Sequence, residues 1–133
     1  MTLNVKNGLG DIIERGPEPE VTVVCITYDH EDFIGEALDS FLEQRTTFRF
    51  QIFVGEDRGP DGTADIIREY AAKYPGVVIP FIREKNMGAQ RNLIDMCQRA
   101  GTKYIAFCEG DDFWTDEYKL QKQYYYMENN PEL

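Results

Sequence analysis

Three carboxylates stand within four residues, at Glu109, Asp111 and Asp112. The apolar run at residues 104–108 comes directly before them and has the character of a strand. A buried strand cannot hold unpaired charges, so we expect these acids to lie at its carboxyl end. Carboxylates gathered there suit a hard divalent cation, which prefers oxygen ligands. Taken alone, this segment is equally consistent with a solvated acidic turn.

Apolar runs and amphipathic stretches alternate along the chain. The runs are rich in β-branched and aromatic residues, as strands covered on both faces are. They lie at residues 21–27, 50–54, 77–82 and 103–108. Stretches with the helical spacing of apolar residues lie at residues 34–42, 63–74 and 93–100, and a last helix is expected at residues 115–129. The alternation predicts an α/β fold with a mostly parallel sheet and flanking helices.

Polar residues follow each predicted strand. Ligands of open α/β sheets bind outside the carboxyl ends of the strands, so we expect the four polar groups to converge on one rim. These groups lie at residues 27–30, 56–58, 83–86 and 109–112. Their convergence, rather than any single group, predicts a binding site.

Local signals refine this plan. Thr63 is expected to cap the second helix at its start. Pro80 lacks a backbone N–H, which indicates a weakly paired strand position. Residues 1–20 are rich in glycine and proline and are expected to form a leader that contributes little to the core. Residues 21–133 are then the domain that carries the site.

Length and charge limit the classes of function. A chain of 133 residues is one domain or part of one, and its formal net charge of −10 argues against nucleic acid as the main partner. Cys25, Cys97 and Cys108 lack metal-ligand spacing and indicate reduced core thiols. No apolar run is long enough for a membrane span, and the first residues lack the apolar core of a secretion signal. We therefore expect a cytoplasmic location. For a longer parent protein, a location at the inner face of the membrane is also compatible with the sequence.

The motifs as a set resemble the family 2 glycosyltransferases. The segment at residues 24–44 resembles the family's opening, in which a Thr-Tyr-Asn-like turn leads into a helix. Residues 56–63 resemble its Asp-Asp-x-Ser-x-Asp-Gly-Thr segment, and residues 86–92 its Asn-x-Gly…Arg-Asn segment. Residues 108–114 resemble its Asp-x-Asp motif, with Glu109 in place of the first Asp. The match covers about residues 21 to 131 in the right order.

This resemblance implies a Rossmann-like GT-A fold that binds a nucleotide-diphosphate sugar, truncated at its C-terminus. It assigns a set of residues to the nucleotide: Thr27, Tyr28, Glu31, Asp57 and Arg91. It assigns a second set to the donor sugar and diphosphate, with Mn²⁺ or Mg²⁺ on Asp111: Glu109, Asp111 and Asp112.

The chemistry of these residue types agrees with the implied roles. The carboxylate of Asp57 can accept a hydrogen bond from the imide N–H of uracil, whereas the corresponding nitrogen of cytosine is an acceptor. Tyr28 offers a packing face for a base. A divalent ion on Asp111 can bridge phosphate oxygens and stabilise a departing diphosphate.

Some residues depart from the family pattern or invite a second interpretation. Arg58 and Gly59 replace a small polar pair, and Glu109 is longer than the usual Asp, so it is expected to point at the sugar or ribose. His30, the only histidine, is more typical of a capping or surface residue than of a base. Residues 124–126, three consecutive tyrosines, indicate helix packing rather than a sugar platform.

The resemblance implies transfer of a sugar from UDP-sugar, or another nucleotide sugar, to a saccharide or lipid-linked acceptor, with inversion at the anomeric centre. Family members place the general base in a second segment, so we expect it beyond Leu133. Two alternatives stay open. A nucleotidyltransferase palm also uses acidic strand ends, but it needs a second acidic strand for two ions. A non-catalytic nucleotide- or metal-binding module is the other alternative.

Overall fold

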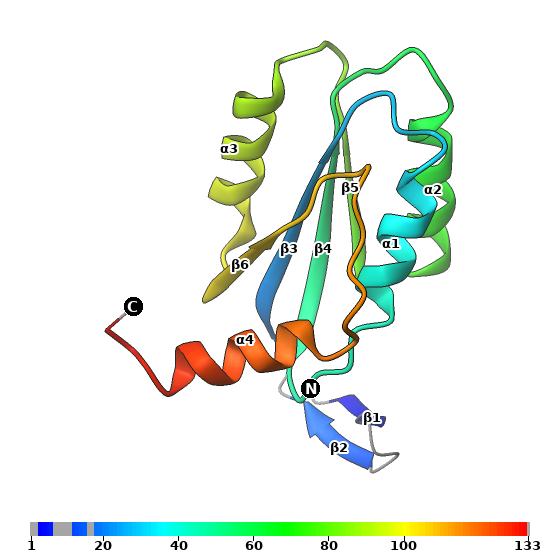
Figure 1. The fold of residues 1–133 in the computed structure, drawn as a ribbon. Helices are drawn as coiled ribbons and strands as arrows, with labels where there is room; N and C mark the ends of the chain where they lie inside the picture. The colour runs from blue at the N-terminus through cyan, green and yellow to red at the C-terminus, as the bar shows by residue number, and fades with distance from the viewer. Residues whose placement is uncertain (1–2, 7–11, 16–17, 133) are drawn as a thin grey trace.

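The computed structural model describes residues 3–6, 12–15 and 18–132. A four-stranded parallel sheet in the order β5-β4-β3-β6 forms its centre (Figure 1). The strands are β3 (Pro19–Thr27), β4 (Arg49–Glu56), β5 (Val78–Ile82) and β6 (Tyr104–Phe107). The predicted α/β fold with a mostly parallel sheet is therefore confirmed.

Helices cover both faces of this sheet (Figure 1). They are α1 (Ile34–Leu42), α2 (Thr63–Lys73), α3 (Ala89–Ala100) and α4 (Lys119–Glu128). Alternate residues of β3 pack into opposite layers: Val23 packs with α1 and α2, and Val24 packs with Met96 of α3. Both faces of β3 are thus buried, which explains its continuous apolar sequence.

The strand register brings the polar groups to one rim. Thr27 at the end of β3 lies opposite Glu56 at the end of β4, and Glu56 lies opposite Ile82 at the end of β5. Beyond β6, the backbone N–H of Gly110 donates to the carbonyl of Ile26 at 2.9 Å. The acidic segment after β6 is thereby held beside the end of β3, as the parallel topology requires.

Helix α4 begins at Lys119, so the predicted start at Thr115 is wrong. The residues before it make other contacts. The carbonyl of Asp116 accepts a hydrogen bond from Gln44 Nε2 at 2.7 Å, and that of Glu117 accepts one from the N–H of Arg45 at 2.8 Å. These hydrogen bonds hold the segment against the end of α1, so the helix begins only after it. Helix α3, in contrast, begins at Ala89, earlier than predicted. Its first turn is polar, so the spacing of apolar residues did not indicate it.

Thr63 does not cap α2 as predicted; it is the first residue of that helix. Its backbone N–H donates to Asp61 Oδ1 at 3.1 Å, so the carboxylate of Asp61 caps the start of the helix instead. Pro80, in contrast, lies in β5, an edge strand of the sheet, where a missing donor is tolerated.

Two further strands precede the sheet. Strands β1 (Leu3–Lys6) and β2 (Ile12–Arg15) pair antiparallel in a separate two-stranded sheet. Neither was predicted, and β3 starts at Pro19, inside the proposed leader. The division of the chain at residue 20 stays a prediction. Cys25 is buried, and all three cysteines are free thiols. None of the helices described has the length and apolarity of a membrane span.

Candidate functional site

A pocket of about 410 Å³ opens at the carboxyl ends of β3 and β4. Four of the residues predicted for a nucleotide-sugar site line it: Thr27, Tyr28, Asp57 and Glu109. Its other walls come from Ile26, His30 and the start of α3. Asn86, in the loop after β5, also lines it, so residues beyond all four strands contribute to one cavity, which is the convergence predicted from the sequence.

Asp57 is buried, with 4% of its surface exposed, and it holds a loop of the pocket. Its carboxylate accepts hydrogen bonds from the backbone N–H groups of Met87, at 2.7 Å, and Gly88, at 2.9 Å. Asn86 Nδ2 donates to its backbone carbonyl at 2.9 Å. A carboxylate has about four lone-pair positions, so both oxygens can still accept a further bond from a ligand.

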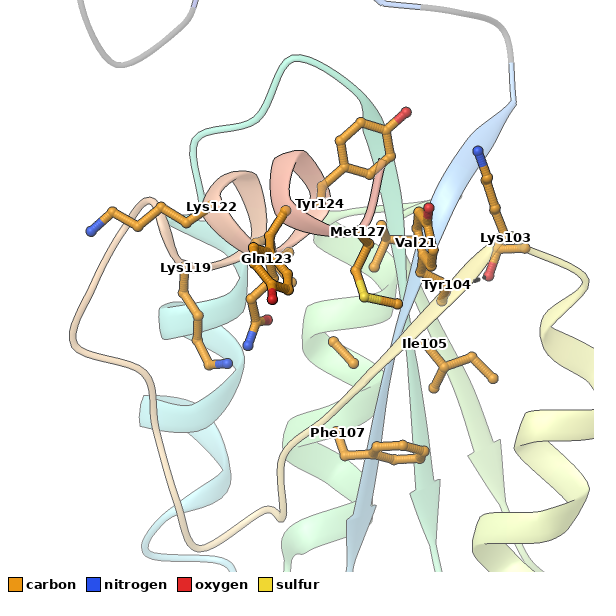
Figure 2. A pocket seen from close by; sticks show the side chains of 14 residues that line it. Val21, Lys103, Tyr104, Ile105, Phe107, Lys119, Lys122, Gln123, Tyr124 and Met127 are labelled. Atoms are coloured by element: carbon orange, nitrogen blue, oxygen red, sulfur yellow. Dashed lines mark hydrogen bonds between the residues drawn. The ribbon is translucent and has the colours of Figure 1, made fainter. Parts of the chain in front are cut away.

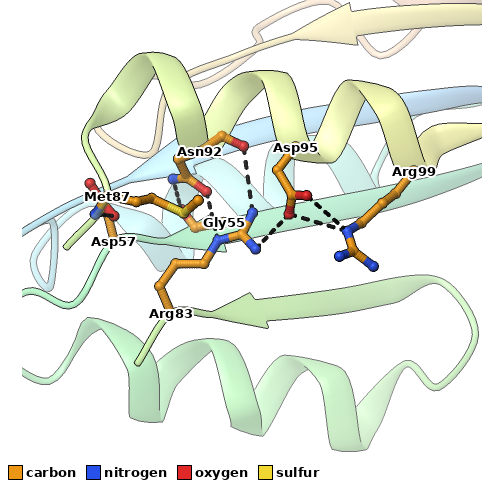
Figure 3. A network of polar contacts seen from close by, with 7 residues as sticks. All are labelled: Gly55, Asp57, Arg83, Met87, Asn92, Asp95 and Arg99. Carbon is orange, nitrogen blue, oxygen red and sulfur yellow. Dashed lines mark hydrogen bonds and ion pairs between the residues drawn. The ribbon is translucent and has the colours of Figure 1, made fainter. Parts of the chain in front are cut away.

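A second polar network fixes α3 over the end of β4 (Figure 3). Asn92 is buried, and its Nδ2 donates to the carbonyl of Gly55 at 2.9 Å. Arg83 donates from Nε to Asn92 Oδ1 at 3.1 Å and from Nη1 to Asp95 Oδ2 at 2.7 Å. Hydrogen bonds from Arg99 and Arg83 lower the pKa of Asp95. This network was not predicted, although Asn92 belongs to the Arg-Asn pair that resembles the family motif.

The loops after β3 and β4 interlock. Asp61 Oδ2 accepts a hydrogen bond from the N–H of Glu31 at 2.9 Å, and the Glu31 carboxylate accepts one from the N–H of Gly62. Asp29 and Arg58, one in each loop, have positive φ angles of 58° and 63°. Glu31 therefore braces the two loops and does not line the pocket.

The acidic segment after β6 packs against the turn that follows β3. Gly110 is buried, and a Cβ atom there would lie 2.4 Å from Thr27 Oγ1 and 3.0 Å from His30 Nδ1. Only glycine fits this approach without displacing Thr27. Asp111 follows with its side chain 48% exposed, and Asp112 Oδ1 accepts a hydrogen bond from the N–H of Phe113 at 3.0 Å.

The donor set of this segment fits a metal ion that is only partly held by protein. Among the described residues, no group of three or more His, Cys, Asp and Glu side chains is placed to hold an ion. Mg²⁺ is usually held by one or two carboxylates, with substrate phosphates and water as its other ligands. Among the ion pairs of the described residues, Asp111 takes part in one, with His30. A rim carboxylate such as Asp111 therefore suits an ion that arrives with a diphosphate.

A family model described as glycosyl transferase family 2 matches residues 22–133. The chain belongs to this family. An uncharacterized protein of Mycobacterium tuberculosis is 44% identical over 112 residues, which are 84% of this chain and 32% of that protein. The chain thus spans about a third of the length of this relative.

Two solved structures resemble this family 2 chain in fold. A mannosyltransferase, PcManGT, from Pyrobaculum calidifontis in complex with GDP-Man and Mn²⁺ gives a TM-score of 0.73 at 22% identity. TarS 1-349 from S. aureus in complex with UDP gives a TM-score of 0.72 at 23% identity. Each match covers 83% of this chain and 32% of the other. The predicted GT-A fold is therefore confirmed.

Of the residues predicted for this family 2 site, Tyr28 lines the pocket, whereas four do not: Glu31, Arg91, Asp111 and Asp112. Tyr28 is 48% exposed and places its ring at the pocket's edge. Arg91, in the first turn of α3, is exposed and does not line the pocket. His30, expected to be a capping or surface residue, lies before α1 with its carbonyl hydrogen-bonded to the first turn, and its ring Nδ1 lies 2.9 Å from Thr27 Oγ1. Thr27 is near in sequence, but Thr63 and Asp111, which also lie against His30, come from distant segments that no local signal indicated.

A larger cavity of about 870 Å³ lies between β6 and α4 and contains none of the predicted site residues (Figure 2). Tyr124 stacks on Phe48 with ring centroids 4.1 Å apart, and its hydroxyl donates to Glu20 at 2.7 Å. Helix packing, as predicted for the three tyrosines, is thus the role of Tyr124, whereas Tyr125 and Tyr126 are exposed.

Proposed function

We propose that residues 21–133 bind the nucleotide diphosphate of a sugar donor, and that the whole protein transfers the sugar to a saccharide or lipid-linked acceptor. The observation that carries this proposal is the pocket at the carboxyl ends of the strands, where Thr27, Tyr28, Asp57 and Glu109 meet in a family 2 chain.

The base and ribose belong on the side of the pocket formed by β3 and β4. Tyr28 packs against the base, and Thr27 sits beneath it at the end of β3. Asp57 already accepts two backbone hydrogen bonds, and we propose that the imide N–H of uracil supplies a third. UDP is therefore the preferred nucleotide. Glu31 acts by bracing the first loop, and Arg91 approaches from α3 when the donor is bound.

The diphosphate and sugar belong on the side formed by the acidic segment. We propose that Asp111 holds Mn²⁺ or Mg²⁺, with Asp112 and Glu109 facing the diphosphate and the donor sugar. The ion neutralises the diphosphate and stabilises it as a leaving group. A chain with a net charge of −10 needs such an ion, because its carboxylates alone would repel the diphosphate. The Mn²⁺ bound with GDP-Man in PcManGT supports this choice of ion.

Transfer needs an oriented acceptor and a base within hydrogen-bonding reach of its hydroxyl. Because the chain spans about a third of the length of its Mycobacterium tuberculosis relative, we assign the acceptor site and the base to the rest of the whole protein. By resemblance to the family, the reaction inverts the anomeric centre. We place it in the cytoplasm, at the inner face of the membrane where the acceptor is lipid-linked.

Calorimetry with UDP, with and without Mn²⁺, tests the proposal on the chain as it stands. We expect UDP to bind only when Mn²⁺ is present, and we expect no product when UDP-sugars and candidate acceptors are added. An affinity for UDP that is the same with and without Mn²⁺ would favour a non-catalytic nucleotide module. Preference for a nucleoside triphosphate with two ions would favour a nucleotidyltransferase. Sugar transfer by this chain at ordinary enzymatic rates would contradict the assignment of the base to another segment.

A further inference from the structure

The imidazole of His30 lies between Thr27, at the end of β3, and the acidic segment after β6. Its Nδ1 is 2.9 Å from Thr27 Oγ1, and its Nε2 is 3.7 Å from Asp111 Oδ2. The ring is mostly shielded, with 20% of the side chain exposed. His30 therefore touches a nucleotide-side residue with one nitrogen and faces the proposed metal ligand with the other.

The backbone around His30 is held in place from a third segment. Its N–H donates to Thr63 Oγ1 at 3.1 Å, and the Thr63 hydroxyl donates to Asp61 Oδ1 at 2.6 Å. Its carbonyl accepts hydrogen bonds from the first residues leading into α1, Phe33 and Ile34, both at 2.9 Å. With both backbone groups engaged, the position of the ring is set by the fold and not by a ligand.

The hydrogen-bonding capacity of the ring assigns a role to each nitrogen. A neutral imidazole carries one N–H donor and one acceptor nitrogen. The Thr27 hydroxyl can donate to Nδ1, and among the described residues that nitrogen is its side-chain partner. We therefore place the proton of the ring on Nε2, the nitrogen that lies nearer the Asp111 carboxylate. The separation of 3.7 Å is longer than a hydrogen bond, and a small rotation of the half-exposed Asp111 side chain shortens it.

Gly110 makes this arrangement possible. It is buried against Thr27 and His30, and a side chain there would collide with Thr27 Oγ1 at 2.4 Å and crowd His30 Nδ1 at 3.0 Å. The close approach brings the backbone of Asp111 within reach of the ring. Thr27, His30 and Gly110 are thus packed as one unit beneath the carboxylate.

We propose that His30 is a positioning residue that orients the Asp111 carboxylate for a divalent cation and couples it, through Thr27, to the nucleotide turn. This inference rests on the proposed function of the site. Carboxylates that ligate metals are usually themselves hydrogen-bonded, which fixes their orientation. A neutral N–H donor suits this task, because a lysine or arginine at the same place would compete with the cation for the carboxylate.

The first test is a long-range ¹H–¹⁵N NMR spectrum of the imidazole in the ligand-free protein. His30 is the only histidine, so its two ring nitrogens are assigned without ambiguity. We expect the neutral ring to carry its proton on Nε2, with Nδ1 as the acceptor. A neutral ring protonated on Nδ1 would overturn the proposal, whether or not the protein binds UDP.

The second test compares two substitutions that each keep one end of the ring. The amide of His30→Gln reaches toward the place of Nε2, whereas that of His30→Asn reaches only the place of Nδ1. Mn²⁺ affinity of the protein with UDP, followed by the EPR signal of free Mn²⁺, should fall about 10- to 100-fold in H30N and stay near the wild-type value in H30Q. Thermal unfolding of both variants checks that the fold is kept.

The outcomes separate this inference from the proposed function. Equal loss of Mn²⁺ affinity in H30N and H30Q, with folded proteins, would overturn the positioning role. Nitrogen couplings of a coordinated imidazole in the Mn²⁺ spectrum would also overturn it, because His30 would then be a ligand itself. A wild-type protein that binds neither UDP nor Mn²⁺ would refute the proposed function, and the ring tautomer would still decide whether His30 is built to orient Asp111.

Discussion

Gly88 donates its backbone N–H to Asp57 Oδ2 at 2.9 Å, which joins the start of α3 to the end of β4 across the pocket. Met87 makes the matching bond to Oδ1 at 2.7 Å. Asp57 thus has a structural part in building the pocket, besides the contact with uracil that we propose. Substitutions at this position should therefore affect both the stability of the fold and the affinity for the nucleotide.

Asp57→Ala should destabilise the protein by about 1–3 kcal/mol, because it removes the charge-assisted hydrogen bonds that the buried carboxylate accepts from the N–H groups of Met87 and Gly88. With Mn²⁺ present, the substitution should also lower the affinity for UDP more than it lowers the affinity for pyrophosphate. A charge-assisted hydrogen bond to the base is worth roughly 1.5–3 kcal/mol, or about one to two decades of affinity. Urea unfolding and calorimetry measure the two effects. Equal weakening of both ligands would place Asp57 on the phosphates or the metal instead.

Asp111→Asn should abolish Mn²⁺-dependent UDP binding and leave the melting temperature nearly unchanged. A half-exposed rim carboxylate contributes little to the core, whereas its charge is central to holding a cation. Glu69→Gln, on the exposed face of α2, removes the same charge and serves as the control. If UDP affinity with Mn²⁺ were the same in both variants and the wild type, the ion would bind elsewhere.

Gly110→Ala should destabilise the protein by about 1–3 kcal/mol, the usual range for overpacking a core. Its new methyl group would lie 2.6 Å from Thr27 Cβ, and this atom cannot move without the strand. Gly35→Ala is the matched control, because its methyl group meets only Tyr70 Oη at the ordinary distance of 3.5 Å. We expect that control to be neutral or slightly stabilising in chemical denaturation. Similar stability for the two variants would mean that Gly110 is not closely packed.

Asp95→Asn should make the stability of the protein less sensitive to acid. Hydrogen bonds from Arg99 and Arg83 lower the pKa of Asp95 in the folded state below its value in the unfolded chain. Its contribution is therefore fully present above the unfolded pKa and is lost as the pH falls through the folded pKa. Urea unfolding between pH 6 and pH 3, an interval of about three pH units around an ordinary carboxyl pKa, compares the two slopes. Parallel curves for wild type and variant would show that the ion pairs do not stabilise the fold.

The sequence alone determined the class of fold and the membership of the site's main residues. The apolar runs at β3, β4 and β5 are nearly continuous because both faces of these strands are covered, so their positions are visible without any tertiary information. Parallel strands place their carboxyl ends at the same edge of a sheet. Thr27, Tyr28, Asp57 and Glu109 could therefore be assigned to one pocket before their distances were known.

Only the tertiary structure decided what each of these side chains contacts. The bonds from Met87 and Gly88 to Asp57, and the position of His30 beneath Gly110, join residues far apart in the sequence. The start of α4 at Lys119 likewise depends on contacts of the preceding segment with α1. Local periodicity depends on neighbours within a few positions, whereas these bonds depend on which loops the completed sheet brings within about 3 Å of one another.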